Sequence, residues 1–163
     1  MLTVKLQKPR INFARYRDLL HTQLSELIAQ AGMKWIEATA EKIPVWSGAS
    51  RGTFNPLASY VGYVLTIGQA DGAPNRVGLG EAMSAATFEA NRDTGIYSFS
   101  YMTTLTHLIV NEYHDARQWG FNLRQPGPYH FQEAGQEAFK NAVRDATLPD
   151  WRRCLTVEQV NIG

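Results

Sequence analysis

The pentapeptide Gly48-Ala49-Ser50-Arg51-Gly52 has the residue types and spacing of a nucleophilic serine site. The pattern G-x-S-x-G is the nucleophile elbow of α/β-hydrolases, in which a strand precedes the serine and a helix follows it. A histidine and an acid from later parts of the sheet activate the serine. Here the residues before Ser50 predict a long helix that ends at Pro44, so no strand precedes the serine. The sequence therefore favours a structural turn over a catalytic Ser50.

A second group of reactive side chains lies in the segment HLIVNEYHD, residues 107 to 115. It contains four residues whose side chains can bind a metal ion or act as a general acid or base: His107, Glu112, His114 and Asp115. On a helix, His107 and His114 would lie two turns, about 10 Å, apart, which is too far to share one ion without further ligands. Glu112 and His114 share one side only on a strand. We therefore expect no metal site and no cofactor here.

Two further patterns point to chemistry more weakly. Residues 78–84, GLGEAMS, contain G-x-G but lack the lysine of a phosphate-binding loop. Tyr97, Phe99 and Tyr101 alternate, as they would in a strand that stacks on RNA bases or in a strand that faces a core. The chain has 16 basic and 15 acidic residues, so it provides no overall field that attracts nucleic acid. These observations favour the core-facing strand.

The composition is that of a globular protein. The chain has 163 residues, of which 44% are hydrophobic and 19% charged, and we expect one domain over residues 1–163 with a substantial core. Cys154 is the only cysteine, so no internal disulfide forms and a reducing compartment is expected. The segment MLTVKLQKPR has no apolar stretch of signal-peptide length, and the run LIV at 108–110 is too short to cross a membrane.

The first predicted element is a helix of about 30 residues that starts near Phe13 and stops before Pro44. Apolar residues recur along it at spacings of three and four: Phe13, Tyr16, Leu20, Leu24, Leu27, Ala31, Trp35 and Ala38. Residues 1–10 are basic, and we interpret them either as an arm for an acidic partner or phosphate backbone, or as the solvated start of the helix. A helix with one apolar stripe of this length must pack on a sheet or another subunit.

The remaining elements complete an α+β chain. Residues 66–87 hold many glycines and alanines and predict a flexible excursion, ordered by contact with a neighbour. Residues 85–90 and 96–102 predict a hairpin, and 131–146 predict a terminal helix that ends before Pro149. The segment from residue 105 to 113 fits a helical face or, through LIV, a buried strand, and we favour a short helix. The C-terminal tail, 148–163, adds an edge strand. We expect a long N-terminal helix and a C-terminal helix packed on a small antiparallel sheet.

The order of these segments resembles the small neck, or tail-completion, proteins of long-tailed bacteriophages. In that family the first helix ends in a stretch of the type (I/T)-P-V-D-T-G-x-L-R-x-S. The matching residues here are Ile43, Pro44, Val45, Gly48 and Arg51. Trp46 and Ser47 replace the usual Asp-Thr, and Ser50 replaces a hydrophobic residue. The resemblance implies a helix-to-helix turn at 44–52, in which Gly48 adopts an unusual backbone conformation and Ser47 caps the next helix.

Two later motifs of the family also have counterparts. Residues 108–114 echo an aromatic-rich Y-A-x-x-V-E-x-G/H segment through Val110, Glu112 and Tyr113. The family's P-F-L-x-x-A motif at the start of its last helix is matched by Pro128, Tyr129 or His130, Phe131 and Ala134. The resemblance covers roughly residues 13 to 147, and the family's loop between its two halves is usually shorter than residues 66 to 95.

The resemblance implies assembly rather than catalysis. Such proteins form closed, commonly sixfold rings between portal and tail tube, which would place this chain in the virion, and in the host cytoplasm during assembly. The expected partners are other copies and neighbouring neck, tail-tube or head-closure proteins, with DNA passing through the lumen without sequence-specific binding. No membrane partner is expected. Candidate interface residues are Arg117, Trp119, Phe121 and Arg124, in a loop-like segment rich in hot-spot residue types, together with Trp46 and Arg51.

Two other functions remain open at this point. The chain could be a small hydrolase or nuclease-like enzyme that uses His107, Glu112 and His114, or it could be a non-viral adaptor domain. Trp119 also has a second interpretation, in which it covers the core beneath its loop. Residues 66–95 and 115–128 are the segments that we expect to contact neighbouring subunits.

Overall fold

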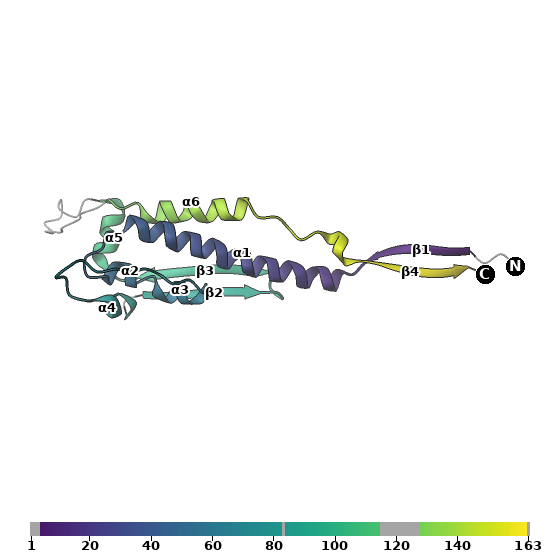
Figure 1. Ribbon diagram of the computed structural model, residues 1–163, viewed down its shortest axis with the longest axis horizontal. Helices are drawn as coiled ribbons and strands as arrows, with labels where there is room; N and C mark the ends of the chain where they lie inside the picture. The colour runs from purple at the N-terminus through teal and green to yellow at the C-terminus, as the bar shows by residue number, and fades with distance from the viewer. Residues whose placement is uncertain (1–3, 83, 115–127, 163) are drawn as a thin grey trace.

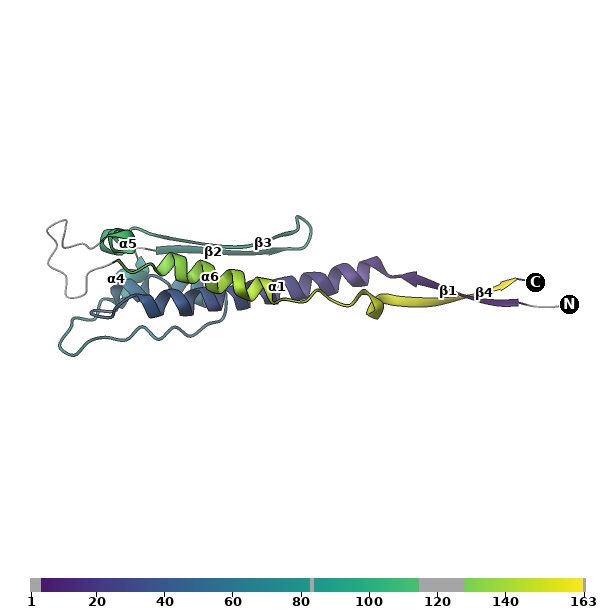
Figure 2. The same cartoon turned by 90° about the horizontal axis from the view of Figure 1, so that it is seen from above.

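The computed structural model describes residues 4–82, 84–114 and 128–162, and the molecule is elongated (Figure 1). Two paired strands that hold both ends of the chain project from one end. A body of helices and a hairpin forms the rest, and the view from above shows the same arrangement (Figure 2). The fold is α+β, with a long N-terminal helix packed against a C-terminal helix and two small antiparallel sheets. No helix within the described residues is long and apolar enough to cross a membrane.

Helix α1, Phe13–Lys42, has the predicted bounds. Asn12 caps its first turn, because its side-chain oxygen accepts a hydrogen bond from the Arg15 amide at 3.0 Å. The helix ends at Lys42, and Ile43 follows it in an extended conformation, because a residue that precedes a proline is disfavoured in a helix. Its buried residues, Ala31, Gly32, Ile36, Thr39 and Ala40, all lie in the C-terminal half, where the body surrounds the helix.

Helix α6, Phe131–Arg144, runs back alongside that half of α1 (Figure 1). The two helices come close at Gly135, which is buried. A Cβ atom at this position would overlap the Thr39 hydroxyl and lie 2.7 Å from Trp35 Nε1. The predicted terminal helix is therefore confirmed, and a glycine within it permits the close approach.

The predicted hairpin is confirmed as strands β2, Ser84–Asn91, and β3, Ile96–Thr103. The strands are antiparallel, with Phe88 opposite Phe99 and Ala86 opposite Tyr101. Half-buried and exposed residues alternate along both strands, so one face packs on the helices and the other faces outward. The alternating aromatic residues of β3 lie on the helix-facing side, as the core-facing interpretation predicted.

The sheet prediction was wrong in its connectivity. Strand β4, Leu155–Ile162, is present, but it does not extend the hairpin; it pairs with β1, Val4–Ile11. The register runs from Val4 opposite Ile162 to Ile11 opposite Leu155. Residues 4–11 thus form a strand rather than the solvated start of a helix. The two strands are separated by almost the whole sequence, so no local pattern reveals their pairing.

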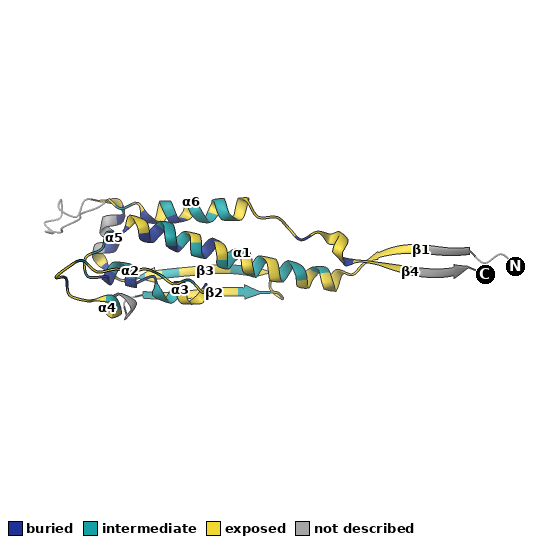
Figure 3. Cartoon of the chain, viewed as in Figure 1, coloured by how far each residue is buried: buried dark blue, intermediate teal, exposed yellow. Residues whose placement is uncertain are grey.

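The short helices lie around the end of α1. They are α2, Ala49–Gly52, α3, Asn55–Tyr60, α4, Val77–Ala82, and α5, Thr106–Tyr113, which confirms the short helix predicted near residue 106. Figure 3 shows that burial is concentrated where these helices meet α1, α6 and the hairpin, whereas the described part of the projecting strands is exposed. The buried core consists of Ile36, Ile43, Phe54, Leu57, Ala58, Val61, Leu105, Leu108 and Phe131.

The close approach at Gly135 generates a stability prediction. We expect Gly135→Ala to lower the free energy of unfolding by about 1–3 kcal/mol, because the new methyl group overlaps Thr39 and Trp35. Urea unfolding followed by circular dichroism measures the change. Gly78→Ala is the matched control, since a Cβ there meets nothing within 4 Å and alanine favours a helix. Equal effects of the two substitutions would contradict close packing at Gly135.

Candidate functional site

The turn at residues 43–52 is held by a hydrogen bond within its own motif. Arg51 of α2 donates from Nε to the Ile43 carbonyl oxygen at 3.0 Å. That oxygen is one of the last carbonyls after α1, which have no helical partner. Partial burial lowers the pKa of the Arg51 guanidinium, and the charge of Glu41 opposes that shift. Arg51, a predicted interface residue, is thus engaged inside the chain.

Gly48 has the backbone conformation that the turn was expected to need. Its φ is +79°, in the left-handed region that favours glycine. A Cβ there would lie 2.8 Å from Val77 Cγ2 and 3.1 Å from the Gly68 carbonyl oxygen. The expectation that Ser47 caps the following helix was wrong, because Gly48 occupies the cap position of α2 and no side chain caps that helix.

The excursion after residue 66 packs on this same turn. The Ala70 amide donates to the Trp46 carbonyl at 2.9 Å, and the Arg76 amide donates to the Ser47 carbonyl at 2.9 Å. Residues 66–82 are therefore ordered by contacts inside the chain, including helix α4, and the expected ordering by a neighbour is not required for them. Trp46 itself remains 37% exposed, so part of its side chain is available at the surface.

Ser50 does not lie in a nucleophile elbow. A loop follows α1, and the four-residue helix α2 then contains Ser50. An elbow needs a strand at the point where this chain has the end of a helix. The Ser50 carbonyl accepts a hydrogen bond from the Thr53 hydroxyl at 2.7 Å, as a local helical bond.

Glu112, in the 107–115 cluster, has a structural role. Its side chain is 1% exposed. One carboxylate oxygen accepts from the Phe131 amide at 2.7 Å and the other accepts from the Gln132 amide at 2.8 Å. These amides lie at the start of α6, where they have no acceptor within the helix. The negative carboxylate also lies at the positive end of the helix dipole. Glu112 of α5 thus caps α6 across a separation of almost twenty residues.

His107 lies in α5, but its side chain is outside what the structure describes. His114 is exposed, and Asp115 lies outside the described residues. His130, which precedes α6, has a φ of +51° and lies 3.7 Å from Glu133 at the surface. Over the described parts of the chain, no three His, Cys, Asp or Glu side chains are placed to hold one metal ion.

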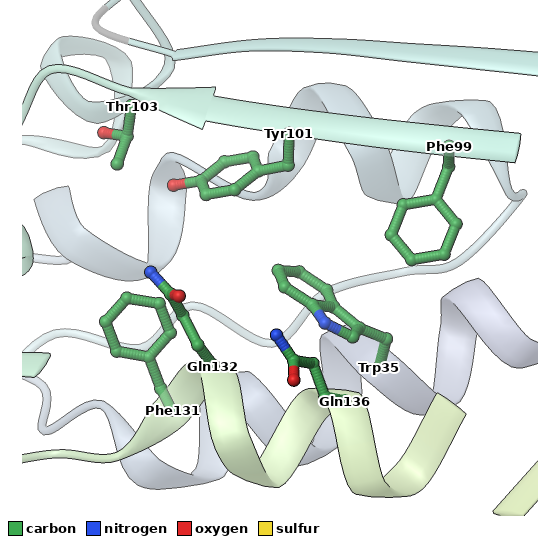
Figure 4. Close-up of a pocket in the computed structure, with 7 residues that line it drawn as sticks. All are labelled: Trp35, Phe99, Tyr101, Thr103, Phe131, Gln132 and Gln136. Atoms are coloured by element: carbon green, nitrogen blue, oxygen red, sulfur yellow. The ribbon is translucent and has the colours of Figure 1, made fainter. Parts of the chain in front are cut away.

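A groove lies between α6 and β3. It consists of two adjoining cavities of about 310 and 300 Å³ that share Trp35, Phe99 and Gln136. In Figure 4, Trp35 rises from α1, Phe99 and Tyr101 come from β3, and Gln132 and Gln136 extend from α6 toward them. The Tyr101 hydroxyl donates to Thr53, and burial raises the pKa of Tyr101.

The chemistry of this groove is that of recognition. Its walls are aromatic rings and carboxamides, and among the described residues that line it Lys140 alone carries a full charge at neutral pH. Aromatic walls with a few hydrogen-bonding groups fit an apolar or polypeptide ligand. The alternation in the sequence predicts core-facing positions for Phe99 and Tyr101 but not the groove, because the α6 wall lies beside β3 only in the tertiary fold.

Four predicted interface residues, Arg117, Trp119, Phe121 and Arg124, lie outside the described residues. Within the described residues, Glu112 of the second family motif is hydrogen-bonded to the start of α6, where the third motif lies. Comparison of the chain with models of known protein families, with curated proteins and with solved structures finds no match.

The role of Glu112 predicts a graded loss of stability. We expect Glu112→Ala to lower the free energy of unfolding by at least about 2 kcal/mol, because two amides lose their acceptor in a buried place. Glu112→Gln retains one carbonyl oxygen and should cost less. Glu133→Ala, at an exposed carboxylate in the same turn of α6, is the control and should change stability by less than about 1 kcal/mol. Urea unfolding measures all three, and a Glu112→Ala protein as stable as the control would disprove the cap.

Proposed function

We propose that this chain is a structural protein of the neck of a long-tailed bacteriophage, where copies of it form a ring that joins or completes the tail at the head–tail interface. The observation that supports this proposal best is that residues of the three motifs of the resemblance form hydrogen bonds that hold the body together. Arg51 binds the Ile43 carbonyl within the first motif, and Glu112 of the second motif caps the helix that the third motif begins.

The use of the candidate catalytic groups favours assembly over turnover. A hydrolase or nuclease-like enzyme built on the 107–115 cluster would need Glu112 to face a substrate or a metal ion. Both oxygens of Glu112 are instead hydrogen-bonded to the backbone, in a place that solvent does not reach. Ser50 follows the end of a helix rather than a strand. These residues stabilise the body.

The partners in this proposal are other copies of the chain and the adjoining virion proteins. The ring would contact neck, tail-tube or head-closure proteins, and DNA would pass through its lumen without sequence-specific contacts. A ring of identical subunits uses one heterologous interface whose rotation closes. The protein would be present in the virion, after assembly in the host cytoplasm. Residues 66–95 and 115–128 are proposed to contact neighbouring subunits or neck partners.

Imaging of assembled particles tests the neck function directly. Electron cryomicroscopy of particles produced with the gene should show density that fits α1, α6 and the hairpin between the portal and the tail tube. Particles produced without the gene should contain heads and tails that are not joined. A normal yield of joined particles without the gene, or density of this fold elsewhere in the virion, would overturn the proposal.

A double substitution tests the predicted interface segment. We expect Arg117→Ala with Trp119→Ala to leave a folded monomer that fails to form rings, because arginine and tryptophan supply much of the binding energy where they lie at the centre of interfaces. Circular dichroism verifies folding, and native mass spectrometry measures ring formation. Rings with wild-type yield would show that these two side chains do not hold the subunits together.

A further inference from the structure

The ribbon formed by β1 and β4 lacks a partner within the described chain. The two strands pair only with each other, and the ribbon projects away from the body (Figures 1 and 2). Its described apolar side chains are exposed, with Leu155 at 40% and Val157 at 61%. The ion pair between Arg10 and Glu158 is itself exposed and contributes little. A two-stranded sheet is marginally stable in water, so this ribbon is suited to pairing with a further strand.

The two outer edges of the ribbon differ in their capacity to accept a strand. The Asn12 amide donates to the Cys154 carbonyl at 2.9 Å, one register position beyond the pair Ile11–Leu155. Hydrogen-bonded pairs alternate along an antiparallel ladder, so Pro9 and Val157, which lie opposite each other, form a non-hydrogen-bonded pair. The backbone groups of Val157 therefore point away from β1. At the outer edge of β1, Pro9 has no amide to offer, and β4 is the open edge.

The body presents a matching edge at β3. This strand pairs only with β2 among the described residues, and its other side borders the aromatic groove. Strands β3 and β4 each have eight residues, so each spans about 26 Å. The groove would receive every second side chain of a strand added there, as in other cases of strand addition. The ribbon of each molecule projects away from its own body, so the added strand must come from another copy (Figure 1).

Charge favours the same pairing. Residues 4–25 and 143–162, which form the ribbon and the first half of α1, contain eight basic and four acidic side chains. Residues 26–114 and 128–142, which form the body, contain six basic and ten acidic ones. The ribbon end of one copy is therefore attracted to the body of another, while two ribbon ends repel each other.

We propose that β4 of one copy adds to the free edge of β3 in the next copy. The two sheets then become one four-stranded sheet in the order β2–β3–β4–β1, and the exposed apolar side chains of β4 fill the groove. The contact is heterologous, so that repetition closes a ring or extends a chain. This inference rests on the proposed function, since it supplies the contact by which the ring closes.

Val157→Pro is the sharpest test. It removes an outward-facing amide from β4 at a position that mirrors Pro9, and it leaves the hydrogen bonds of the β1–β4 ladder in place. Val157→Thr is the matched control, because it keeps the amide and the branched shape. Sedimentation velocity up to millimolar concentration should show self-association of the wild type and of Val157→Thr. Val157→Pro should associate at least about tenfold more weakly. Raising the salt from about 0.05 M to about 0.5 M should weaken the association of the wild type.

A crosslink locates the contact. With the photoreactive residue p-benzoylphenylalanine in place of Val157, mixed isotope-labelled and unlabelled protein should give crosslinks between copies that fall in β3 or α6. Crosslinks confined to other segments, undiminished association of Val157→Pro, or a wild type that stays monomeric would each overturn the strand addition. The first two results would leave the neck function standing. Conversely, a chain that associates through β4 but gives no density between portal and tail would overturn the neck function alone.

Discussion

The body of this protein depends on the bond between the Glu112 carboxylate and the first amides of α6. This contact fixes where α6 begins, and it places Phe131 in the core against Phe54, at a ring separation of 6.2 Å. From that point α6 runs along α1 to the close approach at Gly135. The buried charge is tolerated because two backbone amides and the helix dipole replace the water it has lost. The groove, whose wall is α6, exists only in this arrangement.

Local patterns were sufficient to predict the elements whose stability is decided nearby. The periodic apolar residues before Pro44 gave both ends of α1, and the alternation around Phe88 and Phe99 gave the hairpin. They failed where the deciding contact lies far along the chain. Strand β1 is recognised only with its partner β4, and residues 66–82 look flexible until Val77 is seen to fill the space above Gly48 and Gly52.

In the candidate site, too, some features could be predicted from the sequence and others could not. The role of Gly48 was expected from the resemblance, which implies a turn at 44–52, and a Cβ at this position would indeed overlap Val77. The role of Glu112 was not visible, because a carboxylate that caps a helix from another element leaves no spacing rule in the sequence. The groove was missed for a related reason. Gln132 and Gln136 look like ordinary solvent-facing residues of a helix, and only the position of β3 above them makes them part of a wall.

The unequal distribution of charge and edge strands bears on the symmetry of any assembly. A twofold dimer through β4 would use identical surfaces, so it would bring two basic ribbon ends together, and a register centred on Glu158 would place that carboxylate opposite its own copy. A heterologous contact joins the basic end to the acidic body and leaves Pro9 at the outside of the new sheet, where a missing amide costs nothing. Both the electrostatics and the hydrogen-bonding capacity of the edges therefore favour a head-to-tail arrangement, the type of contact from which closed rings are built.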